Sequence, residues 1–382
     1  MHHYLLAALL VFLPSLACGA ENVVIVQDSG HESEKKYLSG RVITEARDGG
    51  ILLQTRDGFL WAIQPGELLE RTSDQEPFLP FSADELSAEL RKELPAPFEI
   101  HETAHYLVCH NTSKAYAKWC GALYERLYRA FHNYWGRRGL PLHDPEFPLV
   151  AVVFRDKASF EQYSQKELGD VVNSIIGYYS LTTNRVTMYD LTGVEAFRAR
   201  SGRILTVQEI NRALATPKME RTVATVIHEA THQIAFNCGL HGRFADIPLW
   251  LSEGVAMYFE TPDLKSSRGW RNIGGVNHVR LGEFHNGLAG RGDDSLQTLL
   301  ADDQRFRMVG QMADAYPESW ALVYFLIRQK PDRFVEYLKV MAQKKPLIDD
   351  TPETRLAEFR AAFGHDLKKL DAKFVRQLMK VR

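Results

Sequence analysis

The sequence predicts an α+β fold in which a small β module precedes a mixed α/β domain whose C-terminal half is mainly helical. Short strand-like runs separated by Asp-Gly pairs extend from residue 21 to about residue 72, and helical periodicity continues almost unbroken from about Lys218. The length of 382 residues allows two or three domains with full hydrophobic cores. Because 46 Lys and Arg residues are balanced by 48 Asp and Glu residues, the chain lacks the basic excess of a dedicated nucleic-acid binder.

The first twenty residues have the pattern of an export signal. Leu5 to Ala17 is apolar or small except for Ser15, which is too short to span a bilayer but suits the apolar region of a signal peptide. Cleavage after Ala17 or Ala20 would leave small residues at both subsites. Acylation of Cys18 is the less favoured alternative, because Ser15 stands where a lipoprotein signal has a branched apolar residue. We expect residues 1–20 to be a signal peptide and the protein to be periplasmic or extracellular, without a later membrane segment.

Three cysteines remain after export. Cys109 and Cys120 could form a disulfide in an oxidising compartment, which would leave Cys238 free. Alternatively, all three are buried thiols that act as small hydrophobic residues. The sequence leaves both possibilities open.

Residues 21–75 are predicted to form a small SH3-like barrel or curled sheet. The Asp48-Gly49 and Asp57-Gly58 pairs lie between apolar runs, which is a strong hairpin signal. No residue of this module suggests catalysis, so binding or spacing is the expected role. The expected strands are 23–26, 40–44, 51–55 and 59–63.

The rest of the chain is divided into a linker with a capped helix at 76–97, a mixed domain at 98–345 and a C-terminal helical segment at 346–382. Ser82 and Glu85 form the capping-box pattern of a helix that ends near Leu94. The mixed domain is expected to contain strands at 100–108 and 148–154, helices at 113–137 and 160–168, and a hairpin at 177–189.

The most informative motif is His228-Glu229-Ala-Thr-His232, which lies in a stretch with apolar residues at helical spacing. On a helix, residues four apart lie on one face, so both imidazoles can bind a single metal ion. Glu229 would lie beside them, where a carboxylate can hold and deprotonate a metal-bound water molecule. The motif therefore predicts a catalytic metal site.

A second match to this pattern, His101-Glu-Thr-Ala-His105, has a different setting. Pro95 and Pro97 precede it closely, and Tyr106 to Cys109 continues as a strand. In a strand, residues four apart are separated by about 13 Å, which is too far to share one ion. We expect this match to have no metal.

The residues that follow His232 supply a third ligand. Pro248-Leu-Trp-Leu-Ser-Glu253-Gly-Val-Ala-Met-Tyr-Phe-Glu260 would place Glu253 on a second helix and complete the His₂Glu set of a catalytic zinc site. These segments resemble the gluzincin metallopeptidases, and the second is similar to the WLNEGxAxYxE segment of M1 aminopeptidases. Over most of the mature chain, from about Phe98 to Leu338, the sequence resembles DUF1570, an uncharacterised family marked by HExxH.

The resemblance implies one Zn²⁺ ion per chain, bound by His228, His232 and Glu253, with Glu229 as the general base. It implies that Glu260 is a carboxylate that orients a ligand, although a helix-surface glutamate is the alternative. It also places a tyrosine that stabilises the oxyanion near Tyr316. Three other tyrosines compete for that role: Tyr189, Tyr258 and Tyr324.

The same resemblance implies hydrolysis of peptide bonds in a peptide or protein substrate. The spacing from His232 to Glu253 is two residues longer than in M1 enzymes, and no GxMEN-like segment for recognition of a free amine is present. The hairpin at 177–189 could supply a sheet edge for an extended substrate, so we favour an endopeptidase. The alternatives are an inactive peptidase-like binding or scaffold protein of the cell envelope, or a zinc hydrolase that acts on another bond.

Overall fold

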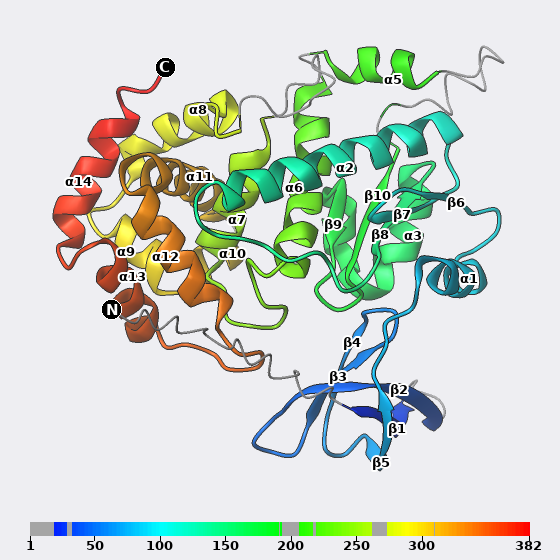
Figure 1. Cartoon of the computed structure of the whole chain (residues 1–382). Helices are drawn as coiled ribbons and strands as arrows, with labels where there is room; N and C mark the ends of the chain where they lie inside the picture. The colour runs from blue at the N-terminus through cyan, green and yellow to red at the C-terminus, as the bar shows by residue number, and fades with distance from the viewer. Residues whose placement is uncertain are drawn as a thin grey trace, which may run out of the picture. The chain divides into compact units, whose positions relative to one another are not determined.

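The chain divides into two compact units, Met1–Pro80 and Phe81–Arg382. The computed structural model (Figure 1) describes residues 19–28, 33–190, 192, 206–216, 219–261, 273–308 and 310–382. The predicted signal peptide, including Cys18, lies outside the described residues except for Gly19 and Ala20. Within these ranges, every helix is too short or too polar to span a bilayer.

The first unit contains a five-stranded antiparallel sheet with the order β4-β3-β2-β1-β5. Its inner face buries a small apolar cluster that includes Val23, Leu38 and Leu53. The two Asp-Gly pairs lie at the turns as predicted, with Gly49 at φ 92° and Gly58 at φ 83°, values that favour glycine. The strands are β1 Gly19–Asp28, β2 Ser33–Glu45, β3 Ile51–Thr55, β4 Leu60–Ile63 and β5 Leu68–Pro77.

The second unit is built on a mixed five-stranded sheet with the order β6-β7-β8-β10-β9. Strands β7, β8 and β10 run parallel, while β6 and β9 are antiparallel edge strands. The strands are β6 Glu99–Glu102, β7 Tyr106–His110, β8 Leu149–Phe154, β9 Gly177–Tyr179 and β10 Arg185–Tyr189.

Helices cover both faces of this sheet, and they are the main elements in the described part of the chain after it. Those that precede residue 190 are α1 Ala83–Glu93, α2 Lys114–Gly136, α3 Lys157–Leu168 and the 3₁₀ helix η1 Gly169–Ser174. The later ones are α5 Val207–Leu214, α6 Glu220–Asn237, α7 Leu249–Phe259, α8 His278–Gly287, η3 Leu288–Gly290, α9 Ser295–Ala301, α10 Gln304–Arg307, α11 Met312–Gln329, α12 Pro331–Ala342, α13 Pro352–Phe363 and α14 Leu367–Leu378. The chain is therefore α+β, as predicted.

Strand β8 shows how the sheet separates two cores. Because side chains alternate along a strand, Ala151 and Val153 pack towards α2 and α6, whereas Val152 and Phe154 pack towards α1 and α3. The first core is the larger and includes residues of the C-terminal helices up to Leu378. Helix α6 thus lies against the sheet on one side and against other helices on the other.

The structure differs from the sequence-based prediction at one strand and at one possible disulfide. A single strand at 100–108 is wrong, because Thr103 donates its backbone N–H to Tyr106 O at 2.9 Å and turns the chain into the β6-β7 hairpin. The possible Cys109–Cys120 disulfide is also wrong. Both thiols are free and buried, and they belong to the two cores on opposite faces of the sheet. The alternative of buried cysteines is confirmed.

Candidate metal centre

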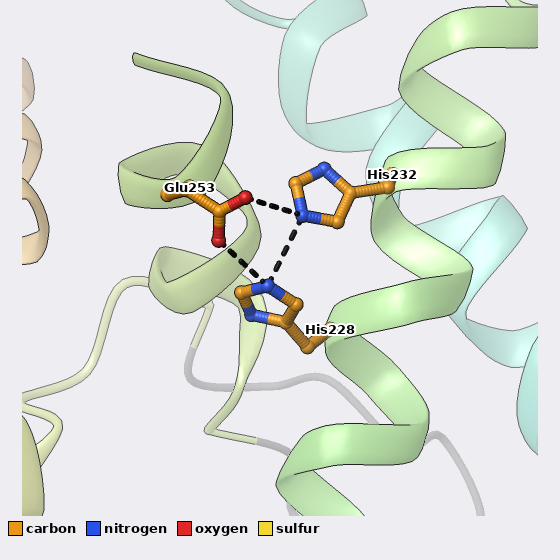
Figure 2. A group of neighbouring side chains, drawn as sticks. All are labelled: His228, His232 and Glu253. Atoms are coloured by element: carbon orange, nitrogen blue, oxygen red, sulfur yellow. Dashed lines mark hydrogen bonds and ion pairs between the residues drawn. The ribbon is translucent and has the colours of Figure 1, made fainter. Parts of the chain in front are cut away.

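Helix α6 carries the two histidines of the predicted motif. Its apolar positions Val226, Ile227, Ala230 and Ile234 are buried at helical spacing, which fixes the orientation of the remaining faces. His228 and His232 therefore point from one face, one turn apart (Figure 2).

Helix α7 brings the third residue, Glu253, to the same place. The N-terminus of α7 is fixed by Asp303, whose Oδ1 accepts the backbone N–H of Leu249 at 3.0 Å. Gly254 allows α7 to pack closely against α11, since a Cβ there would lie 2.7 Å from the carbonyl oxygen of Ser319. With one side of α7 pressed against α11, Glu253 faces α6 (Figure 2).

The ligand atoms of these three side chains converge. Glu253 Oε2 lies 3.0 Å from His228 Nε2, Glu253 Oε1 lies 3.4 Å from His232 Nε2, and the two Nε2 atoms are 3.1 Å apart (Figure 2). The side chains are 10–15% exposed. In the described part of the chain, no other group of three or more His, Cys, Asp or Glu side chains could hold a metal ion.

Outer partners orient both imidazoles. Glu260 Oε1 lies 2.8 Å from His228 Nδ1, and Asn277 Nδ2 donates to Glu260 Oε2 at 3.0 Å. Ser252 Oγ lies 3.3 Å from His232 Nδ1. A carboxylate behind a histidine fixes the proton on Nδ1, which leaves a lone pair on Nε2 for a metal ion. Glu260 is therefore buried beside the motif and is not a helix-surface residue.

The electrostatics of the cluster favour a cation at its centre. Burial disfavours the imidazolium of His228, but hydrogen bonds with Glu253 and Glu260 outweigh burial and raise its pKa well above the usual range. Burial alone would raise the pKa of Glu253, but His232 and His228 outweigh it and hold this pKa below the usual range. Without a positive charge, two lone pairs and a carboxylate would face each other at about 3 Å. Two imidazoles and a carboxylate are also ligands that zinc accepts, so the residues fit this ion.

Glu229 lies beside the cluster without joining it. Its Oε2 accepts the backbone N–H of Tyr179, on strand β9, at 2.8 Å. Burial raises the pKa of Glu229, against the opposing effect of the two histidines. Glu229 and the three candidate ligands line one pocket of about 420 Å³.

Tyr316 lines the same pocket. Burial, together with Glu253 and Glu229, raises the pKa of this phenol, so its hydroxyl remains a hydrogen-bond donor. The three competing tyrosines do not line the pocket. Tyr258 instead shares a hydrogen bond with Tyr134, Tyr189 packs on Phe160, and Tyr324 packs on Trp320.

The part of the chain that carries all three candidate ligands also has a family match. Residues 222–348 match the family model described as Protein of unknown function (DUF1570). The predicted resemblance to DUF1570 is confirmed over this segment, although the match begins well after Phe98 and ends beyond Leu338. No curated protein matches the chain.

Several residues around the pocket were not found from the sequence. Ser252, Asn277 and Arg280 lie within the DUF1570 segment, and Tyr179 precedes it. Ser252 directly precedes Glu253, which was the one available signal. The others have no characteristic spacing from His228 or His232, because packing between distant segments brings them here.

The earlier HExxH match, at 101–105, has a different local structure. His101 and His105 lie on either side of the β6-β7 turn, and His105 Nδ1 lies 2.9 Å from Glu125 Oε2 on α2. Glu125 also accepts the backbone N–H of His105 at 2.7 Å and the hydroxyl of Thr103 at 2.8 Å. These contacts stabilise the hairpin.

Proposed function

We propose that this chain is a zinc-dependent peptidase whose second unit has a gluzincin-like fold. It would bind one Zn²⁺ ion through His228, His232 and Glu253. The observation that carries the proposal is the convergence of these three ligand atoms within 4.8 Å of one another, with Glu260 behind one imidazole and Glu229 beside the cluster.

The chain's own residues suit hydrolysis by an activated water molecule. Bound zinc would polarise the scissile carbonyl and make a water molecule more acidic. Glu229 accepts the proton of that water and passes it to the leaving nitrogen, for which a raised pKa is favourable. Tyr316, which stays protonated, donates a hydrogen bond to the carbonyl oxygen as negative charge develops there.

Strand β9, beside the pocket, is suited to bind an extended peptide substrate. Strand β9 is an edge of its sheet, and its residues Tyr178 and Tyr179 line the pocket. The N–H of Tyr179 points away from β10 and donates to Glu229, so the outer edge of β9 faces the reacting groups. A peptide that pairs with β9 would pass the metal site in extended form, which favours internal cleavage.

We also propose that the protein acts outside the cytoplasm. The support is the short apolar run Leu5–Ala17, which has the length of an export signal.

The test begins with the metal content of the purified mature chain, measured by mass spectrometry for wild type and Glu253→Ala. We expect about one zinc per wild-type chain and much less in the variant. A peptide library is then incubated with zinc-loaded wild type and zinc-loaded Glu229→Gln. Cleavage by wild type alone would support the proposal. Zinc binding without cleavage of any peptide would favour a binding or scaffold protein, and no zinc uptake at neutral pH would exclude the metal site.

A further inference from the structure

The pocket at the metal site is lined by apolar side chains at one end of α6 and by a charged side chain at the other. Five residues of this helix line it, from Thr225 to Phe236, a distance of about 16 Å at the usual helical rise. Beyond His232, Phe236 packs against the ring of Tyr179 with centroids 5.9 Å apart. Four other apolar residues also line the pocket: Leu181, Ala245, Ile247 and Leu249. The Phe236 end of the pocket is therefore formed by two aromatic rings.

The opposite end carries a positive charge. Arg280, from α8, is the only lysine or arginine among the described residues that line the pocket. Its Nη2 lies 3.7 Å from Glu260 Oε1, and Glu260 contacts His228, so the guanidinium lies towards the Thr225 end of α6. Asn277 connects the same elements, since it accepts the backbone N–H of Arg280 at 3.2 Å and donates to Glu260.

The guanidinium has donors to spare. Among described residues, its one hydrogen-bonded partner is Glu283, at 3.2 Å on the same helix. Glu283 is 36% exposed, and exposed pairs of this kind are weak. The 3.7 Å separation from Glu260 is beyond hydrogen-bonding distance. An arginine carries five N–H groups in a fixed fork that matches a carboxylate, so a second anion can bind beside Glu283.

We propose that Arg280 binds a carboxylate of the substrate and makes this anionic group a condition for efficient cleavage. The substrate would present an apolar side chain towards Phe236 and a carboxylate towards Arg280, with the scissile bond between them. This inference rests on the proposed peptidase function. The carboxylate has two possible sources, the C-terminus of a peptide or the side chain of an internal Asp or Glu.

Four forms of one peptide test the proposal and distinguish the two sources. The peptide is the library member that wild type cleaves best. It is synthesised once with a free C-terminus and once with a C-terminal amide. Two further amidated forms carry either Asp or Asn at the position nearest the Arg280 end of the pocket. Binding to zinc-loaded Glu229→Gln is measured by calorimetry, and kcat/KM by cleavage with wild type. The same measurements are made after Arg280→Gln and Arg280→Lys, with Arg376→Gln on the exposed face of α14 as the matched control.

We expect one carboxylate-bearing form to bind at least about tenfold more tightly than its neutral counterpart. Arg280→Gln should reduce this ratio to near one with unchanged zinc content, Arg280→Lys should keep part of it, and Arg376→Gln should keep all of it. A role of Arg280 in merely supporting Glu260 would alter zinc affinity and leave the ratio unchanged. If wild type cleaves all four forms equally, or if the ratio survives Arg280→Gln, the proposal is wrong while the peptidase function stands. If zinc-loaded wild type cleaves no library member, both the role of Arg280 and the peptidase function are wrong.

Discussion

The chain contains the pattern His-Glu-x-x-His twice, and the two copies have different structures. The copy at 228–232 lies on α6, where both imidazoles face Glu253. The copy at 101–105 crosses a β-turn, and His105 is held by Glu125. Identical residue types at identical spacing thus form a candidate metal centre in one place and a structural contact in the other. Residues four apart converge only when the backbone between them is helical.

The largest expected difference between the two copies is in metal binding. His232→Ala should reduce zinc from about one ion per chain to nearly none, because a His₂Glu site loses one of its three ligands. His101→Ala, in the other copy, should keep the zinc of wild type. Metal content after dialysis, measured with circular dichroism to check folding, tests both variants. Equal zinc content in wild type and His232→Ala would show that His232 is not a zinc ligand.

The central glutamates of the two copies should differ almost as much in catalysis. Glu229→Gln should lower kcat by about 10²- to 10⁴-fold with zinc retained, because the general base is lost. Glu102→Gln is its matched control, since Glu102 is exposed on β6. Hydrolysis of a library-derived peptide measures the effect. A similar loss in both variants would show that the change acts through folding.

A smaller effect is expected from the carboxylate behind His228. Glu260→Gln should weaken zinc binding by about 10- to 100-fold, since the amide holds the imidazole less firmly and makes it a weaker ligand. Glu283→Gln is the control, because Glu283 also pairs with Arg280 but is not among the described residues that line the pocket. Competition with a chromophoric chelator gives the affinities, and equal values for the two variants would contradict the role of Glu260.

The smallest effect concerns the first copy, where we expect only a contribution to stability. Burial alone would raise the pKa of Glu125, but hydrogen bonds from His105 and Thr103 outweigh it and lower this pKa below the usual value of a glutamate. Such a carboxylate stabilises the fold above the pKa of the unfolded state, and this stabilisation is lost as the pH falls through the folded-state value. Glu125→Gln should therefore cost about 1–2 kcal/mol at neutral pH.

Urea unfolding of wild type and Glu125→Gln tests this expectation. The difference between them should become smaller as the pH falls below about 4.5, because wild type then loses its own carboxylate. Zinc content should be unchanged by the substitution. A difference that does not vary with pH would mean that Glu125 acts through packing alone.

Sequence patterns predicted the secondary structure correctly where interactions between residues close in sequence determine it. The capping box at Ser82 and Glu85 forms both of its hydrogen bonds, and the predicted helix 113–137 appears as Lys114–Gly136 with Ser113 as its cap. The single strand at 100–108 failed for the opposite reason. Glu125, twenty residues away from His105, stabilises a turn that no pattern within 100–108 indicates.

The sequence by itself determined the helix that carries His228, Glu229 and His232, because the spacing of ligands and apolar residues along one helix is a local property. Its resemblance to a known family pointed to Glu253. Only the tertiary structure decided that Glu260 and Asn277 stand behind His228, that the backbone of Tyr179 meets Glu229, and that Arg280 faces the pocket. These contacts join elements far apart along the chain, and they depend on how close-packed helices and an edge strand fit together.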